Sequence, residues 1–334
     1  MSEEQLSPAQ ATTAASAVLD RVEQAVVGKR AALTLVLAAI LARGHVLLED
    51  YPGLGKTLAA RSFAQSLGLD FTRAQFTPDL LPADLTGAYV YDQRLSEFDF
   101  RAGPLFTGLL LADEINRTPP KTQSALLEAM QEHQVTVEGT THRLPQPFHV
   151  LATANPVEYE GTYPLPEAQL DRFLMRVSFG YPTQAEEVDV LRRRVQRRAE
   201  DQLLEAVTDS AGLQAIQRAI ETVPIEDDIA LYCVRLAAHT RTHASAQIGS
   251  SPRGSLALML TARAYAVIDG RDFVTPEDVK AVAHAVLDHR ISIKPELWMQ
   301  ADAAFRVVTA ALANVPVPPA RDQSSGPSTS TAAS

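Results

Sequence analysis

Residues 45–57 read HVLLEDYPGLGKT and residues 58–64 continue LAARSFA, which predicts a strand, a glycine turn and a helix in succession. The apolar run at 46–48 is typical of a buried parallel strand, and apolar positions at helical spacing follow the turn. Glycines let backbone N–H groups turn toward a polyphosphate, and the N-terminus of the helix adds partial positive charge. The stretch therefore predicts a phosphate-binding loop, in which Lys56 reaches the β- and γ-phosphates and the Thr57 hydroxyl binds Mg²⁺.

This loop is a variant of the usual pattern. Its first position is Asp50, where the motif has glycine, so we expect Gly53 to supply the turn. The alternative is an ordinary glycine turn that ends a strand. The loop by itself leaves both possibilities open, and the rest of the chain favours the phosphate loop.

Two further apolar strands end in polar residues that suit phosphoryl transfer. Residues 108–112 read GLLLA before Asp113 and Glu114, and residues 148–152 read FHVLA before Thr153 and Asn155. Ligands of open parallel sheets lie at the carboxyl ends of the strands. We therefore predict that Asp113 orders the waters around Mg²⁺, Glu114 accepts a proton from the attacking water, and Asn155 positions that water. The alternative for the two acids is a solvated strand end.

Two arginines are placed to supply positive charge opposite the γ-phosphate. Arg172 ends a short helix predicted at 166–172, and Arg253 begins a helix that has Ser251 as its N-cap and Pro252 at its first position. Arg117 follows the strand at 108–112 and is a candidate for a further arginine that acts on a neighbouring subunit. The sequence does not favour this role over its absence.

Composition limits the class of protein. The 334 residues carry a net charge of −10, which argues against a surface built mainly for nucleic acid, although a local basic loop stays compatible with it. The single cysteine, Cys233, lies in an apolar helical stretch and allows no disulfide or cysteine metal site within the chain. The acidic N-terminus has no apolar signal segment, and no apolar run is long enough to span a bilayer, so we expect a cytoplasmic protein.

The pattern of elements predicts an α/β fold, an αβα core with a parallel sheet followed by a C-terminal α-helical domain. The predicted divisions are a flexible N-terminus at 1–14, a nucleotide-binding core at 15–181, a helical domain at 182–314 and a disordered tail at 315–334. Alternating residues predict β-hairpin inserts at about 88–101 and 134–147. Helices in the second domain are predicted at 183–199, 210–222, 226–243, 253–269 and 275–288.

Five motifs together resemble the MoxR family of AAA+ ATPases, and the resemblance covers roughly residues 14–290. The motifs are LLEDYPGLGKT at 47–57, LADEINR at 111–117, ATANP at 152–156, EGTYPLPEAQLDRF at 160–173 and SPR at 251–253. The resemblance implies an AAA+ core with a helical lid, in which the two hairpins are the helix-2 insert and the pre-sensor-1 insert.

The same resemblance implies roles for individual residues. Asp113 and Glu114 are Walker B, Asn155 is sensor 1, Arg172 is the arginine finger and Arg253 is sensor 2. Closure of the lid would bring Arg253 to the phosphates. Adenine would contact Val27 and Gly28, where the family's following glutamine is replaced by Lys29. Walker A and its flanking positions would hold ATP through Pro52, Gly53, Leu54, Gly55, Lys56, Thr57 and Leu58.

The resemblance further implies a homo-oligomeric ring, usually a hexamer, that acts as a chaperone-like motor on client proteins, often with a von Willebrand factor A domain partner. Two alternatives stay open: a motor that translocates nucleic acid, and a nucleotide-gated scaffold that scarcely hydrolyses ATP. His239 and His243 have a metal-pair spacing, but no third ligand accompanies them, so packing or surface histidines are favoured.

Overall fold

A five-stranded parallel sheet forms the centre of the computed structural model, which describes residues 6–94, 96–156, 161–197, 203–297, 299–300 and 302–319. The strand order is β2-β5-β8-β1-β9, so β8 separates the strand of the glycine loop from the strand of the two acids. The sheet strands are β1 (Val46–Glu49), β2 (Phe71–Gln75), β5 (Leu109–Asp113), β8 (His149–Ala154) and β9 (Met175–Val177).

Helices cover both faces of this sheet because its strands are apolar on both sides. In β1, Val46 and Leu48 belong to one buried cluster and Leu47 belongs to the other. Side chains alternate across a strand, so one short apolar run supplies both layers. The helices of the core are α1 (Pro8–Glu23), α2 (Arg30–Leu41), α3 (Lys56–Ser66), α4 (Pro82–Thr86), η1 (Ile115–Arg117), α5 (Pro120–Glu132) and α6 (Glu167–Leu170).

The first helix begins earlier than the sequence prediction placed it. Residues 8–14, which were predicted to be flexible, form the first turns of α1. The Ser7 hydroxyl accepts a hydrogen bond from the Gln10 backbone amide, and the Gln10 side-chain oxygen accepts one from the Ser7 backbone amide, while Pro8 occupies the first helical turn. This capping box satisfies amides that an uncapped helix end leaves unpaired. Residues 1–5 lie outside the described part of the chain.

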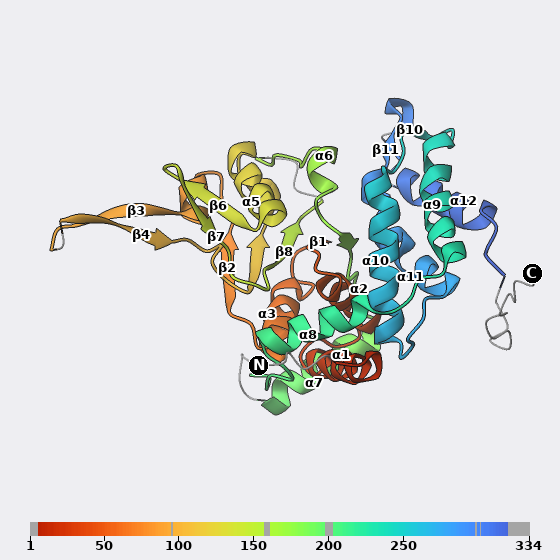
Figure 1. Ribbon diagram of the computed structural model, residues 1–334, viewed down its shortest axis with the longest axis horizontal. Helices are drawn as coiled ribbons and strands as arrows, with labels where there is room; N and C mark the ends of the chain where they lie inside the picture. Colours follow the sequence, from red (N-terminus) through yellow and green to blue (C-terminus); the bar gives the residue numbers. More distant parts are fainter. Residues whose placement is uncertain are drawn as a thin grey trace, which may run out of the picture.

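Both predicted hairpins are present, and an aromatic contact joins them. The first consists of β3 (Gly87–Asp92) and β4 (Glu97–Ala102) and projects far from the sheet (Figure 1). The second consists of β6 (Gln134–Val137) and β7 (Thr140–Arg143). The ring of His142 stacks on Phe100 with centroids 3.8 Å apart. The bases of the two inserts are therefore packed against each other.

The second half of the chain is mainly helical, and its last helices lie at the opposite end of the molecule from the β3–β4 hairpin (Figure 1). Two short strands here and the final helix were not predicted from the sequence. The helices are α7 (Gln184–Arg197), α8 (Ser210–Glu221), α9 (Asp227–Thr242), α10 (Pro252–Ile268), α11 (Pro276–Leu287), η2 (Asp288–Arg290), η3 (Pro295–Leu297) and α12 (Ala303–Asn314), and the strands are β10 (Ala246–Ile248) and β11 (Ser292–Ile293).

These helices do not form a core of their own. Helix α8 packs against α1 and α2, and Gln217 donates a 2.9 Å hydrogen bond to the Ile40 carbonyl at the end of α2. Thr12 of α1 bonds the Val267 carbonyl of α10 at 2.8 Å. One apolar cluster runs continuously from α1 to α12. The domain boundary near residue 182 stays a prediction, and the predicted disordered tail lies outside the described residues from 320 onward.

Candidate active site

A cavity of about 350 Å³ opens at the carboxyl ends of the parallel strands. Residues from β5, β8 and the glycine loop surround it, as the sheet order requires, because β8 lies between β1 and β5. Its lining consists of Pro52, Gly53, Gly55, Lys56, Thr57, Leu58, Asp113, Glu114, Thr153 and Asn155. The structure thus brings together the loop, the acid pair and the asparagine that sequence analysis proposed from separate motifs.

Two glycines give the loop its shape. Gly53 and Gly55 have φ values of 82° and 83°, in the left-handed region that side chains disfavour. A Cβ at either position would meet no atom within 4 Å, so the space beside the loop is open. Gly55 is the N-cap of α3, and the first amides of that 11-residue helix begin at Lys56. The loop has the open space and free helix N-terminus that a polyphosphate requires.

The unusual Asp50 has a structural role that the sequence did not reveal. Its carboxylate is buried and accepts hydrogen bonds from the Ser178 hydroxyl at 2.9 Å and from the Phe179 and Gly180 amides. These three residues directly follow β9. The position where the motif has glycine therefore fastens the start of the loop to the edge of the sheet.

We expect Asp50→Ala to lower the free energy of unfolding by about 1–3 kcal/mol, because the buried Phe179 amide loses its acceptor. Urea unfolding measures this change. Asp272→Ala, which removes an exposed carboxylate, is the matched control and should change stability by less than about 0.5 kcal/mol. Equal stability of the two variants would contradict this role of Asp50.

Lys56 is held over the loop before any ligand arrives. Its ammonium donates a 2.6 Å hydrogen bond to the Asp50 carbonyl. Burial lowers the pKa of Lys56 from its usual value, and the nearby Asp50 and Asp113 carboxylates oppose that shift. A phosphate would supply the negative charge that a partly buried ammonium lacks.

The acid pair is oriented by neighbours that sequence analysis missed. The Thr153 hydroxyl donates a hydrogen bond to the Asp113 carboxylate at 2.6 Å and accepts one from the Glu114 backbone amide at 2.8 Å. It therefore fixes the two acids relative to each other. Arg73 of β2 donates to the other Asp113 oxygen at 3.0 and 2.7 Å. Gln75 donates to the Glu114 carboxylate at 2.6 Å. Arg73 and Gln75 lie two residues apart, on the same side of a strand that ends beside the acids. This spacing is the only indication of their role that the sequence offered.

Glu114 has an uncommon backbone conformation, with φ 58° and ψ 50°. A non-glycine residue in this region is worth attention, because strain of this kind concentrates at functional sites. Arg117, the candidate second arginine, forms a 3.3 Å ion pair with the Glu114 carboxylate of its own chain. Its predicted action on a neighbouring subunit stays a prediction.

Asn155 is buried at the edge of the cavity. Its backbone carbonyl accepts a 3.3 Å hydrogen bond from the Asn116 side chain, which ties the end of β8 to the turn after β5. The backbone at Asn155 is therefore held by the turn that follows β5.

A second cavity of about 380 Å³ adjoins the first and shares Gly53, Gly55 and Leu58 with it. It is mainly apolar and is lined from α7 by Val190 and Leu191 and from the turn before α2 by Ala25, Val26, Val27 and Lys29. Val27, one of the two predicted adenine contacts, lines this cavity together with Leu54, whereas Gly28 is not in its lining. Adenine binding by Val27 and Gly28 stays a prediction.

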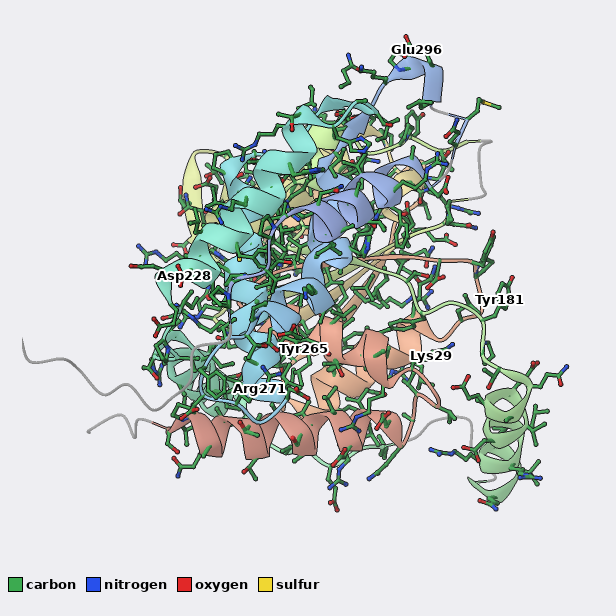
Figure 2. All side chains as sticks on the ribbon, turned by 90° about the vertical axis from the view of Figure 1, so that its right-hand side faces the viewer. Lys29, Tyr181, Asp228, Tyr265, Arg271 and Glu296 are labelled. Carbon is green, nitrogen blue, oxygen red and sulfur yellow. The ribbon has the colours of Figure 1, made fainter. Side chains whose placement is uncertain are left out.

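The turn before α2 leaves no room for a side chain at Gly28. Gly28 has φ 72°, and a Cβ there would lie 2.2 Å from the Glu186 carboxyl carbon. Lys29, which replaces the family's glutamine, donates a 3.0 Å hydrogen bond to the Tyr181 carbonyl, and both residues lie at one edge of the molecule (Figure 2). Lys29 thus fixes the turn to the segment before α7.

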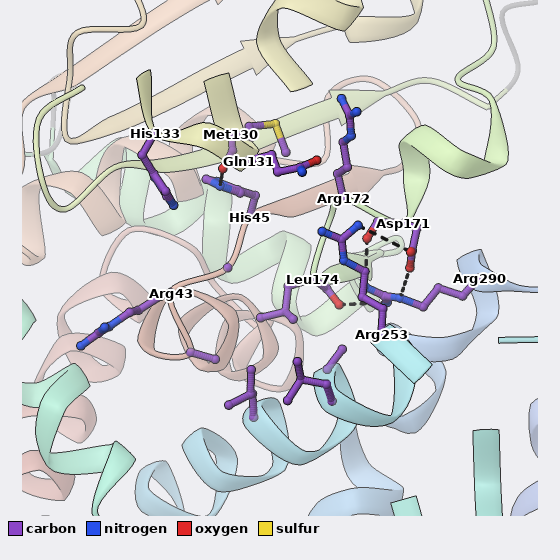
Figure 3. A pocket seen from close by; sticks show the side chains of 15 residues that line it. Arg43, His45, Met130, Gln131, His133, Asp171, Arg172, Leu174, Arg253 and Arg290 are labelled. Carbon is purple, nitrogen blue, oxygen red and sulfur yellow. Dashed lines mark hydrogen bonds and ion pairs between the residues drawn. The ribbon is translucent and has the colours of Figure 1, made fainter. Parts of the chain in front are cut away.

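The two predicted arginines lie together, but away from the Lys56 cavity. Arg172 and Arg253 line another cavity, of about 260 Å³, between α2, α5 and the start of α10. Arg253 pairs with Asp171 at 3.7 Å, whereas Arg172 points away from that carboxylate (Figure 3). Within the part of the chain that the structure describes, Arg172 forms no ion pair. Lid closure onto the Lys56 cavity by Arg253 therefore stays a prediction.

Other candidates have structural explanations. The rings of His239 and His243 lie 6.2 Å apart, and among the described residues no group of three metal-ligating side chains surrounds them. Cys233 is buried, which raises its pKa to about 12 and makes it a packing residue. Trp298 lies outside the described residues. No described helix is long and apolar enough to cross a membrane.

A parallel sheet with a phosphate-type loop and a helical lid defines the AAA class of nucleotide-binding proteins, and comparisons with known families agree. The family described as "ATPase family associated with various cellular activities (AAA)" matches residues 45–175, and an AAA lid domain matches residues 238–307. A crystal structure from Cytophaga hutchinsonii has a TM-score of 0.86 and 40% identity, and covers 92% of this chain and 96% of that chain.

Individual relatives narrow the class. The uncharacterized protein YeaC of Bacillus subtilis is 50% identical over 301 residues, which are 90% of this chain and 93% of that protein. Chaperone MoxR1 of Mycobacterium tuberculosis is 42% identical over 279 residues, covering 81% of this chain and 73% of its own. This chain belongs to the MoxR family of AAA+ ATPases. The family and the fold class expected from the sequence are thereby confirmed.

Proposed function

We propose that this protein binds ATP with Mg²⁺ in the Lys56 cavity and hydrolyses it. The observation that carries the proposal is the lining of that cavity, where Lys56 and Thr57 face Asp113, Glu114 and Asn155. The adjoining apolar cavity offers a place for the adenine base. No other cavity described here combines a helix N-terminus, a lysine and two carboxylates.

The residues present suit the metal as well as the nucleotide. The Thr57 hydroxyl and the Asp113 carboxylate are oxygen ligands of the kind Mg²⁺ prefers, and Asp113 also suits indirect binding through water. When bound, Mg²⁺ neutralises phosphate charge. Thr153 and Arg73 fix the orientation of the Asp113 carboxylate, which a cation would share with the Arg73 guanidinium.

The chemistry of hydrolysis falls to residues of this chain. Glu114 accepts the proton of the attacking water, and Asn155 orients that water from the adjacent strand. Lys56 stabilises the β- and γ-phosphate oxygens. Because phosphoryl transfer requires mainly positioning and charge stabilisation, these groups suffice apart from a cation on the far side of the γ-phosphate.

A neighbouring subunit supplies that cation. Arg172 and Arg253 line a cavity separate from the Lys56 cavity of their own chain, and the Arg172 guanidinium has no carboxylate partner among the described residues. In a closed ring, one subunit's arginine face meets the next subunit's nucleotide. We propose a homo-oligomer, with a hexamer as the expected form, in which Arg172 acts on the neighbour's ATP.

The ring would act as a chaperone-like motor that matures or assembles partner protein complexes. The support is family membership, since one relative is named Chaperone MoxR1, together with the two insert hairpins that project from the core. A von Willebrand factor A domain protein is the proposed partner. The alternative function is translocation of nucleic acid. ATPase activity that DNA stimulates in a salt-sensitive manner would indicate it.

A mixing experiment tests both hydrolysis and the ring. Arg172→Ala alone should lower turnover by about 10³-fold with ATP affinity nearly unchanged, because an arginine finger acts in the transition state. Mixed with Glu114→Gln, it should regain activity at about a quarter of the interfaces, which pair an intact Glu114 with a neighbour's intact Arg172. Steady-state phosphate release measures this. No recovery on mixing would contradict action between subunits, and inactive wild-type protein would overturn the proposed function.

A further inference from the structure

The segment that carries Arg172 is held by the lid of its own chain. Ser292 of the lid contacts the Glu167 carboxylate, and His289 bonds the Phe173 carbonyl at 3.1 Å. Between them Arg290 reaches across to Asp171 and to the backbone on either side of Phe173. Three residues of the lid segment 288–293 therefore contact the segment 167–174 near both of its ends.

Arg290 makes most of these contacts. Its guanidinium donates to the Asp171 carboxylate at 2.7 Å, to the Phe173 carbonyl at 2.8 Å and to the Leu174 carbonyl at 3.2 Å. The planar guanidinium fork can satisfy several acceptors at fixed angles, which a lysine ammonium cannot do. Arg172, whose own peptide lies between Asp171 and Phe173, is thus placed by the group that holds both of its neighbours.

Arg290 is also deeply buried, with only 2% of its side chain exposed. Burial lowers its pKa to about 10, and the Asp171 carboxylate opposes the shift, so the guanidinium stays charged near neutral pH. Burying a charge has a desolvation free-energy cost, which a partner of opposite charge offsets. Here the partner, Asp171, also pairs with Arg253, so that carboxylate joins two arginines of the lid (Figure 3).

We infer that Arg290 is a positioning residue for hydrolysis on the neighbouring subunit: it locks the Arg172 turn to the lid, which carries Arg253, as one rigid unit. The inference rests on the proposed function, because it presumes that this unit faces the neighbour's ATP. Movement of the lid then moves the arginine finger with it. The lid of one subunit thereby controls turnover in the cavity of the next.

The test uses the full-length Arg290→Met variant, whose apolar side chain suits a buried site. We expect unchanged ATP affinity and turnover lowered by about 10- to 100-fold, because a small misplacement of an oriented group has effects of that size. Mixing with Glu114→Gln, which keeps its own Arg290 unit, should restore activity. Arg290→Lys should recover little, since it lacks the planar fork.

A matched control separates positioning from general damage to the lid. Arg271 is a second lid arginine, with hydrogen bonds to Thr275 and to the buried Asp278, and its described contacts do not reach residues 167–174. Arg271→Met should lower thermal stability without reducing turnover of the folded protein. If Arg290→Met does not fold, Asp171→Asn removes the same charge pairing and should show the same defect and the same recovery.

The outcomes are distinct. Full turnover in Arg290→Met or Asp171→Asn would overturn the inference. The inference would also be overturned if mixing with Glu114→Gln restored the turnover of Arg172→Ala but not that of the Arg290 or Asp171 variant. Arg290 would then act within its own subunit. Failure of the Arg172→Ala mixture as well would instead count against the proposed function.

Discussion

Glu114→Gln should lower ATP turnover by about 10²- to 10⁴-fold and leave ATP bound, because glutamine keeps the shape of the side chain but accepts no proton. Glu114 is suited to this role by its position: its amide is held by Thr153 at 2.8 Å and its carboxylate by Gln75 at 2.6 Å. Neither contact depends strongly on the negative charge, so both should survive the substitution, whereas the ion pair with Arg117 is lost. Single-turnover phosphate release and equilibrium ATP binding, measured together, separate chemistry from affinity.

Glu128→Gln is the matched control for this variant, since it makes the same chemical change on the exposed side of α5. It should retain full activity. Rapid turnover in Glu114→Gln would show that another group activates the water. A variant that neither binds nor hydrolyses ATP would mean that Glu114 mainly supports the structure of the cavity.

Lys56→Ala is expected to weaken ATP binding by at least about 100-fold, which corresponds to about 3 kcal/mol from lost charge-assisted hydrogen bonds. The remaining loop amides cannot replace a positive charge held beside the phosphates. Titration with a fluorescent ATP analogue measures the affinity. Lys280→Ala, which removes a half-buried lysine from α11, is the control, and circular dichroism confirms that both variants fold. Wild-type affinity in Lys56→Ala would exclude the proposed nucleotide site.

The Lys56 pKa adds a dependence on pH. Only the protonated ammonium attracts phosphate, and burial lowers its pKa in the free protein. ATP affinity should therefore begin to fall at a lower pH than an exposed lysine would allow, as the ammonium loses its proton. The Lys56→Ala variant should lack this alkaline limb of the affinity profile.

The loop of the Lys56 cavity was predicted from local sequence. The strand, turn and helix at 46–64 follow one another directly, so their apolar pattern and glycines predict the loop without knowledge of the fold. The capping box at Ser7 and Gln10 was equally legible and was overlooked, which is why α1 begins before its predicted start. Thr275 and Asp278 form a capping box at the start of α11, which lies within the helix predicted at 275–288.

The pairing register of the strands and the packing of the lid against the core could not be predicted from the sequence. Gln75 lies opposite Asp113 in the β2–β5 ladder, and only that register brings Arg73 and Gln75 to the acid pair. The short strands β10 and β11 contribute too few residues for an alternating pattern, so they were missed.

The amino-acid sequence by itself determined the phosphate loop, the acid pair and the family, because each depends on neighbouring residues whose spacing sets local geometry. The tertiary structure alone decided which way the arginines face. Arg253 and Arg290 are far from Asp171 along the chain, and they meet beside Arg172 at that carboxylate only because the lid packs against α2 and the end of the sheet. Such packing depends on the whole apolar surface of both parts, which no single motif encodes.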